Sequence, residues 1–541
     1  MNELITDGQY NIGHLCTTRQ CELGRGQKVA MRWISAHQES TDYTFANLDA
    51  ESNRFANLLD GLGVLPGEVF FTFLPKMPEQ FFAFLGTLKR QAVCGTLFSN
   101  FGEDALLDRL GDSRAVGIIT KKSFLRKINR VWEQLPDLRF VILVDADEHQ
   151  SDKVLSYSRL METADTTWET PCTPAETASV LHYTSGSTGK PKGALHAHRS
   201  VLLQSATTRE VLGVTGDDIY WCTADQGWVT GTSYGIIGPW SLGVTQVHYG
   251  GVYDPAIWMG LLQNEGITVW YTAPTALRML MREPAELYAS FDLSALRHIS
   301  SVGEPLNPEV IAWAHRVLEK QIYDTWFQTE TGGILIPNRP GLPVRPGSMG
   351  TPANGIEAAI LADDGTLLDN NIHGNLCIKS GWASMFITYI NNQDKYDSRF
   401  RNGYYYTGDT AYRDDDGYYW FVGRSDDVIN TSGHLVSPFE VESALLELDE
   451  VVESGVIGVP DDLLFEKVIT YVALRTGVAM SPELDLKIKL HVSNRLSSIA
   501  APHEVIVIEK IPKNKSGKIM RRVLKAWHQG LDAGDISTME D

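Results

Sequence analysis

The chain has 541 residues, of which 43% are hydrophobic and 21% are charged, and its formal net charge is −20. This length exceeds what one hydrophobic core supports, so we expect at least two domains. The negative charge argues against nucleic acid as a general partner, and the sequence has no run of about eighteen apolar residues that would predict a membrane span.

The N-terminus and the cysteines both bear on the cellular compartment. Residues 1–14 show neither the basic nor the apolar segment of a secretory signal peptide. The six cysteines are scattered and form no Cys-x-x-Cys pair. We therefore expect a cytoplasmic protein without a disulfide framework or a thiolate zinc site, whose cysteines are mostly small buried hydrophobes.

From about residue 40 to 420, short apolar runs alternate with amphipathic stretches. Helical spacing of apolar residues predicts helices at 44–63 and 307–320. Continuous apolar runs predict buried strands at 116–120, 139–145, 179–184 and 267–273. This alternation predicts a large α/β domain whose parallel sheets are sandwiched by helices.

The pattern of predicted helices and strands changes after Gly423. Just before it, residues 412–423 (YRDDDGYYWFVG) predict a β-hairpin around an Asp-Gly turn. Beyond it we expect helices at 439–448 and 483–496 and strands at 451–459, 467–474 and 504–511. These elements suffice for a small α+β domain, so we place an N-terminal domain at 1–423, a hinge at 424–426 and a mobile C-terminal domain at 427–541.

The stretch YTSGSTGKPKG at 183–193 follows an apolar strand and precedes residues 194–206, which have helical character. It is not a Walker A loop, because proline follows Gly189-Lys190 where a hydroxyl residue is required. A solvated surface loop is the commoner role of such a composition, but a buried strand leading into the loop favours phosphate binding. The string supplies hydroxyls, glycines and cations: Ser185, Ser187, Thr188, Gly186, Gly189, Gly193, Lys190 and Lys192.

The full string strongly resembles the phosphate loop of the AMP-forming acyl-CoA synthetases, which belong to the adenylate-forming superfamily. Five further motifs occur in the order of that family, and the resemblance covers nearly the whole chain, most weakly over the first forty residues. It implies a reaction in two steps with ATP, Mg²⁺ and coenzyme A. A carboxylate first attacks the α-phosphate of ATP to give acyl-AMP and pyrophosphate, and the thiol of coenzyme A then displaces AMP.

The resemblance also implies where the nucleotide binds. SVGEPLNP (301–308) is similar to the adenine-binding stretch, although by itself it could be an ordinary strand-to-helix turn, and YDTWFQTETGG (323–333) is similar to the segment along the nucleotide and its phosphates. Glu330 is implied to be the Mg²⁺ ligand, in keeping with the preference of Mg²⁺ for carboxylate and phosphate oxygen. The residues implied to bind the nucleotide are Thr184, Ser185, Gly186, Ser187, Thr188, Gly189, Lys190, Gly303, Glu304, Pro305, Asp324, Thr325, Trp326, Thr329, Asp409 and Arg424.

Residues near and beyond the predicted hinge complete the implied machinery. Asp409, in YYTGD, resembles the acid that binds both ribose hydroxyls, and a carboxylate offers two acceptors for a vicinal diol. Arg424 matches a nucleotide-contacting arginine and Asp426 the hinge residue, although FVGRSDDV alone could be a surface ion-pair cluster. Lys518, in KNKSGKIMRR, matches the lysine that promotes adenylation and then swings away. With Glu330, the implied catalytic residues are Lys518, Thr184 and Lys192.

Coenzyme A is implied to enter between the domains after the C-terminal domain rotates. Gly433, in SGH, and Ala273, in YTAPTALR, match walls of the pantetheine tunnel, and Arg126 is our candidate for the 3′-phosphate. Many relatives carry arginine where this chain has Leu435, which puts any role of that arginine in doubt here.

TADQGWVTGTSYG (223–235) and the tail AGDISTMED resemble the short bacterial and archaeal acetyl-CoA synthetases. The implied acyl pocket consists of Val229, Thr230, Val302 and Phe327. Acetate-specific relatives usually carry tryptophan at the position of Phe327, and medium-chain relatives often carry glycine. Phenylalanine should close the pocket yet leave room for about one more methylene, worth about 0.8 kcal/mol, so we expect acetate, with propionate also accepted.

Two alternative functions would use the same nucleotide site. An adenylating enzyme could pass its acyl group to a carrier protein, although the chain shows no appended carrier domain; a non-enzymatic nucleotide sensor would need neither Lys518 nor Glu330. HAH at 196–198 could suggest a metal site, but two histidines at i and i+2 on a helix point apart, so we expect a structural role. We expect small-molecule partners only, and the near-equilibrium chemistry also permits the reverse reaction.

Overall fold

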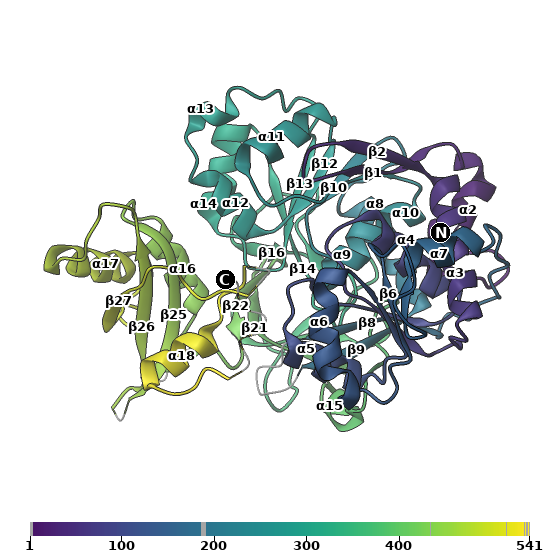
Figure 1. Cartoon of the computed structure of the whole chain (residues 1–541). Coiled ribbons are helices and arrows are strands. Elements are labelled where there is room, and N and C mark those ends of the chain that lie inside the picture. The colour runs from purple at the N-terminus through teal and green to yellow at the C-terminus, as the bar shows by residue number, and fades with distance from the viewer. Residues whose placement is uncertain are drawn as a thin grey trace.

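A computed structural model of the chain describes residues 4–184, 191–432, 434–461, 463–514, 517–534, 536 and 539. Within these residues the strands form four β-sheets, and the elements beyond residue 428 gather in a separate lobe on the left of Figure 1. Among the described residues, no helix is both long and apolar enough to cross a bilayer.

Two eight-stranded sheets of the described chain form the centre of the large lobe. The first has the strand order β15 (Ile336–Pro337), β14 (Ile322–Trp326), β13 (His298–Val302), β12 (Val269–Thr272), β10 (Ile219–Cys222), β11 (Thr245–Tyr249), β1 (Val29–Ile34) and β2 (Ser40–Thr44). The second has the order β19 (Thr388–Tyr389), β9 (Lys192–Ala197), β8 (Ala178–Thr184), β4 (Val93–Thr96), β3 (Val69–Thr72), β5 (Gly117–Thr120), β6 (Phe140–Leu143) and β7 (Val154–Ser156). The inner strands are parallel, as predicted, and antiparallel strands lie at both ends of the first sheet and at the β19 end of the second.

The two remaining sheets are smaller and mostly antiparallel. One contains β16 (Ser348–Gly350), β22 (Tyr419–Arg424), β21 (Tyr404–Arg413), β18 (Gly374–Lys379) and β17 (Ala358–Leu361), with β20 (Phe400–Arg401) paired to β21. The other contains β24 (His434–Val436), β23 (Ile429–Thr431), β26 (Phe465–Leu474), β25 (Val451–Asp461) and β27 (Glu504–Val507). The predicted hairpin at 412–423 is confirmed by the pairing of β21 with β22.

Helices cover the sheets. Those of the large lobe are α1 (Ile12–Cys16), α2 (Thr18–Gln20), α3 (Phe45–Gly61), α4 (Pro78–Lys89), α5 (Glu103–Asp112), α6 (Lys122–Val131), α7 (Tyr157–Thr163), α8 (Val201–Glu210), α9 (Val229–Thr232), α10 (Gly238–Ser241), α11 (Pro255–Asn264), α12 (Pro274–Met281), α13 (Ala285–Tyr288), α14 (Pro308–Trp313) and α15 (Gln393–Asp397). Those of the small lobe are α16 (Pro438–Leu446), α17 (Pro482–Arg495) and α18 (Arg521–Gln529). The predicted helix at 307–320 is α14, continued by a π-helical segment at Ala314–Leu318.

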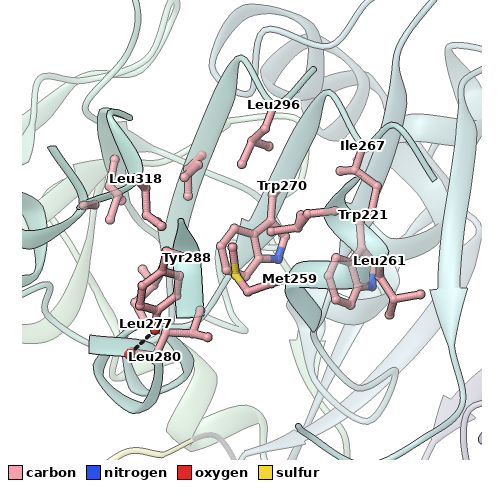
Figure 2. Close-up of a cluster of buried hydrophobic side chains, with 14 of the residues drawn as sticks. Trp221, Met259, Leu261, Ile267, Trp270, Leu277, Leu280, Tyr288, Leu296 and Leu318 are labelled. Atoms are coloured by element: carbon pink, nitrogen blue, oxygen red, sulfur yellow. Dashed lines mark hydrogen bonds between the residues drawn. The ribbon is translucent and has the colours of Figure 1, made fainter. Parts of the chain in front are cut away.

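The core on one face of the first sheet shows why β10 and β12 are apolar. Trp221 and Trp270, from neighbouring strands, stack at 6.1 Å between ring centroids and lie against Met259 and Leu261 of α11 (Figure 2). Burying an apolar side chain of this size contributes about 1.5–3 kcal/mol, so helices and sheet are held together mainly by such contacts.

One predicted element is wrong. Residues 194–206 were expected to be helical, but Lys192–Ala197 form β9, and α8 begins only at Val201. β9 pairs with β8 on one side and with β19 on the other, and these ladders satisfy its backbone and override local helical character. His196 and His198 are therefore not on one helix: His196 lies within β9, and His198 begins a 3₁₀ turn.

Candidate active site

The predicted phosphate loop closes the hairpin between β8 and β9. Thr184, the last residue of β8, pairs with Lys192, the first residue of β9. Loop residues 185–190 and Gly433 lie outside the described residues, so the structure gives no placement for them. The two ends of the loop are nevertheless fixed by sheet pairing, and they bring Thr184 and Lys192 to the same region.

The adenine and phosphate motifs follow two neighbouring parallel strands. Val302, at the end of β13, pairs in register with Thr325 of β14. Because both strands are parallel, their following segments leave the same edge of the sheet, where ligands bind in open α/β sheets. Gly303 has a φ of +98°, which favours glycine, and a Cβ there would point into open space. This edge therefore offers an uncrowded surface beside Asp324 and Trp326, as a planar base requires.

Asp409 and Arg424 face each other across β21 and β22, so their ion pair is built into the register of the hairpin. Arg424 Nη1 donates to Asp409 Oδ1 at 2.7 Å. The second carboxylate oxygen accepts from Trp326 Nε1 at 3.1 Å and from Gln328 Nε2 at 3.0 Å. Asp409 thus joins β21 to the segment that follows β14, and brings three predicted motifs together.

Glu330 lies next to this network on the phosphate side. Tyr389 donates from its hydroxyl to Glu330 Oε1 at 2.6 Å, and β19, which carries Tyr389, pairs with β9 beside the phosphate loop. Among the described residues, no group of three His, Cys, Asp or Glu side chains could hold a metal ion. The other oxygen of Glu330 accepts no hydrogen bond from the described residues, and such a carboxylate suits Mg²⁺, which commonly takes one or two carboxylates plus substrate phosphates.

Lys518 reaches this region from the small lobe. A tight turn holds its backbone: Lys518 N–H donates to Asn514 Oδ1 at 3.0 Å, and Asn514 N–H donates to the Lys518 carbonyl at 2.8 Å. Its side chain lines a cavity between the lobes together with Pro305 and Arg424. The surrounding protein lowers the pKa of Lys518, chiefly by desolvation, and Arg424 lowers it further while Asp409 opposes this.

Glu304, predicted to line the base, is engaged at the boundary between the lobes. It forms an ion pair with Arg278 and accepts from Thr275 Oγ1 at 2.6 Å. Thr275 also lies 3.4 Å from the carbonyl oxygen of Gly517, the residue before Lys518. Nothing in the local sequence pairs Glu304 with Arg278, because the contact arises from packing of α12 against the segment after β13.

The predicted acyl-pocket residues lie in one neighbourhood. Val302 and the partly buried Phe327 share a hydrophobic cluster with Tyr234, whose ring meets that of Phe327 edge-on at 5.5 Å. Thr230 precedes Tyr234 by four residues on continuous helical segments, so both lie on one helix face. Val229 and Thr230 are buried. Sequence reasoning missed Tyr234, although it lies within the TSYG string.

The predicted coenzyme A residues are less closely connected. Arg126 is exposed on α6, and Ala273 is the N-cap residue of α12, two residues before Thr275. Leu435, which stands where many relatives carry arginine, is 48% exposed on β24. Gly433 lies outside the described residues, and no hydrogen bond or ion pair among the described residues links Arg126 to Ala273.

Comparison with known proteins identifies the family to which a chain with this arrangement of site residues belongs. Residues 18–389 match the family described as AMP-binding enzyme, and residues 440–518 match the AMP-binding enzyme C-terminal domain. The chain belongs to the AMP-binding enzyme family. Its lobes correspond to the two family regions.

Relatives in this family align with nearly the whole chain. It is 46% identical to the acetyl-coenzyme A synthetase of Bacillus subtilis (strain 168), covering 99% of this chain and 93% of that protein. It is 38% identical to the acetyl-coenzyme A synthetase of Pyrobaculum aerophilum, covering 99% and 85% respectively. Among solved structures, the anthranilate CoA ligase AuaEII in complex with anthranoyl-AMP superposes with a TM-score of 0.88 at 28% identity, covering 98% of this chain and 100% of that one.

Proposed function

We infer that the protein is an AMP-forming acetate–CoA ligase, which joins acetate to coenzyme A with consumption of ATP. The similarity to acetyl-coenzyme A synthetases over 99% of the chain supports this reaction, its cofactors ATP, Mg²⁺ and coenzyme A, and small molecules as its partners. The carrier-protein alternative is not favoured by these relatives. The observation that supports the residue assignments is that Asp409, Glu330 and Lys518, from three separate segments, all interact electrostatically with Arg424.

In the proposed adenylation step, the protein aligns two anions and provides no covalent nucleophile. Asp409 receives the ribose hydroxyls, which replace part of its present hydrogen bonding, and Arg424 holds its carboxylate in position. Mg²⁺, held by Glu330, would neutralise charge on the phosphates. Lys192 and Lys518 place cations on either side of the α-phosphate, where negative charge develops on the equatorial oxygens.

The second step requires the ammonium group of Lys518 to leave the active site and coenzyme A to enter it. β22 ends at Arg424 and the next strand begins at Ile429 in a different sheet. The segment between them is a turn, in which the N–H groups of Asp427 and Val428 both donate to the Arg424 carbonyl. We place the hinge at 424–426, with Asp426 exposed at its end, and the domains at 1–423 and 427–541. Rotation there would bring the segment that carries Gly433 toward Ala273 and the acyl-adenylate.

The acyl pocket should favour acetate and also accept propionate. Phe327 closes the pocket against Tyr234, yet it is smaller than the tryptophan of acetate-specific relatives. A pocket discriminates one methylene by only about ten- to two-hundredfold. We also propose a cytoplasmic location, in keeping with six free cysteines, of which Cys16, Cys94, Cys222 and Cys377 are buried.

The test of this function is a product analysis with purified protein, acetate, MgATP and coenzyme A. Stoichiometric acetyl-CoA, AMP and pyrophosphate are expected, and ADP with phosphate would contradict the assignment. Leaving out coenzyme A should preserve acetate-dependent exchange of pyrophosphate into ATP. Measuring kcat/KM from acetate to hexanoate tests the pocket, since highest activity with hexanoate would exclude closure by Phe327.

A further inference from the structure

Arg399 lies beside the candidate nucleotide site, outside every motif that assigns that site. Its backbone is fixed on both sides: Arg399 N–H donates to the Tyr396 carbonyl at 2.9 Å, and Tyr406 N–H donates to the Arg399 carbonyl at 2.8 Å. Tyr396 and Phe400 pack on Phe386, with ring centroids at 4.9 and 6.2 Å. The start of the Arg399 side chain is therefore held in place by a sheet and an aromatic cluster.

The guanidinium of Arg399 borders that of Arg424, and no acid among the described residues is close enough to form an ion pair with it. A Cβ placed on Gly408 would lie 3.0 Å from Arg399 Nη1 and 3.2 Å from Arg424 Nη2, so both guanidiniums border the same glycine. Arg399 Nη1 makes a long contact of 3.4 Å with the Tyr406 carbonyl. Its Nε is buried without a hydrogen-bond partner among the described residues. Buried donors are normally satisfied, so this arrangement indicates an absent acceptor.

The charges around Arg399 show what kind of acceptor it lacks. Lys192 interacts electrostatically with the cations Lys395, Arg399 and Arg424, and with the acid Glu330. Asp409 is already bonded to Arg424, Trp326 and Gln328, so it adds little neutralising charge. Like charges this close disfavour one another unless an anion lies between them. A polyphosphate supplies several negative charges over the distance that such a cluster spans.

We propose that Arg399 is a further catalytic residue of the adenylation site, whose guanidinium binds the β- and γ-phosphates of MgATP and then the departing pyrophosphate. This proposal rests on the proposed function. Arg399 lies on the Glu330 and Tyr389 side of the site: it interacts electrostatically with both residues. Arg424 already donates a hydrogen bond to Asp409, on the side of the site where we place the ribose. The planar fork of an arginine suits two phosphate oxygens at once.

Arg399 contributes to adenylation by binding the leaving group, pyrophosphate. An acetate oxygen forms a bond to the α-phosphorus, and the bond from that phosphorus to the oxygen bridging the β-phosphorus breaks. The electron pair of the broken bond leaves with pyrophosphate, and no proton is transferred. Arg399 binds the oxygens on which this charge accumulates, so it stabilises both the transition state and the pyrophosphate product.

The test compares Arg399→Gln and Arg399→Lys with Arg401→Gln in the full-length protein. Arg401 is a matched control because it lies two residues away on β20, is exposed, and packs over the ring of Tyr406 instead of facing Arg424. Acetate-dependent exchange of pyrophosphate into ATP, thioester formation from supplied acetyl-AMP, and the Tm shift caused by magnesium pyrophosphate, MgATP or AMP are measured for each variant.

Arg399→Gln should lower kcat/KM for MgATP in the exchange assay by about 10²-fold, as expected for loss of one charge-stabilising group. It should also remove most of the Tm shift caused by magnesium pyrophosphate, whereas the AMP shift and the thioester step stay within about twofold of wild type. Arg399→Lys should restore part of the loss, because it keeps the charge but not the fork. Arg401→Gln should behave like wild type.

Unchanged affinity of Arg399→Gln for magnesium pyrophosphate and MgATP would overturn the proposal, and so would an equal loss of AMP binding. A lowered Tm without ligand and equal losses in both half-reactions would indicate a structural role and would also overturn it. Failure of the proposed function is recognised separately, because it appears as absence of acetate-dependent exchange in the wild-type protein. The ligand-induced Tm shifts need no acyl substrate, so they still decide the role of Arg399.

Discussion

Arg282 Nη2, at the end of α12, lies 3.1 Å from Glu453 Oε1 on β25 and joins the large lobe to the small one. Lys513 Nζ donates to the same carboxylate oxygen at 2.8 Å, five residues before Lys518. Burial raises the pKa of Glu453, but Lys513 and then Arg282 outweigh this and hold the pKa below its ordinary value. The carboxylate therefore ties the large lobe to the strand and turn that present Lys518.

Glu453→Gln should weaken the arrangement in which Lys518 faces the nucleotide. The side chain of Arg282 is 40% exposed, so the ion pair is worth only about 0.2–1 kcal/mol. We expect adenylation, measured by pyrophosphate exchange, to slow by about two- to fivefold. Thioester formation from acetyl-AMP should be unchanged or faster. Lys487→Gln, which removes a surface ion pair with Glu450 inside the small lobe, should change neither; equal effects of both substitutions would contradict the prediction.

Lys518→Ala should separate the two half-reactions. The ammonium group lines the cavity between the lobes and has Asp409 and Arg424 as charged neighbours, so it is placed to act on the phosphates. We expect pyrophosphate exchange to fall by about 10²- to 10³-fold, whereas supplied acetyl-AMP and coenzyme A still give acetyl-CoA at a rate near that of wild type. Comparable loss of both steps would show that Lys518 supports the fold or both conformations. Lys489→Ala, at a partly exposed position on α17 where the lysine pairs with Asp485, is the control.

Phe327 should set the length of the acyl group. Phe327→Trp adds volume against Tyr234 and should shift kcat/KM toward acetate over propionate by about tenfold, within the range that one methylene allows. Phe327→Gly removes the ring and should raise relative activity with butyrate and hexanoate, at some cost in stability because the ring packs edge-on against Tyr234. The KM for MgATP serves as the internal control. An unchanged order of acids in both variants would place the acyl group elsewhere.

The free energy of unfolding should fall in mild acid because three histidines are buried in the folded protein. Burial lowers the pKa of His182 to about 3, of His196 to about 4 and of His198 to about 3. Each pKa is lower in the folded than in the unfolded chain, so each histidine contributes stability that is present above about pH 6.5 and is lost as the pH falls toward 3–4. One such histidine changes the free energy of unfolding by about 1.4 kcal/mol per pH unit in this window.

Urea unfolding at pH 7.0, 6.0 and 5.0 measures this loss. His198→Asn should flatten the pH dependence by about one proton, because an amide oxygen can still accept from the Ile12 N–H that His198 Nδ1 now binds at 3.0 Å. His37→Asn, at an exposed position, should leave the slope unchanged. A wild-type slope that stays flat down to pH 5 would mean that these rings are protonated or accessible in the folded protein.

The individual elements and the order of the motifs could be predicted from the sequence because both depend on local patterns. The apolar runs at 117–120, 140–143 and 269–272 are buried strands as expected, and periodicity predicted α3 and α17. Asp409 and Arg424 were predicted separately from their strings, and their pairing arises from a hairpin whose Asp-Gly turn is visible in the sequence. The resemblance to a family also depends on residues that are close in the chain.

Only the tertiary structure decided which distant residues share an environment. β9 is a strand because β8 and β19 lie on either side of it, and no local pattern carries that information. Glu304 meets Arg278 and Thr275, and Arg399 lies beside Arg424, through the packing of segments that the sequence separates. Periodicity and turn chemistry depend on neighbours along the chain, so the sequence by itself determined them. Hydrogen-bond geometry and the repulsion of neighbouring charges depend on distances in space, so only the fold decided them.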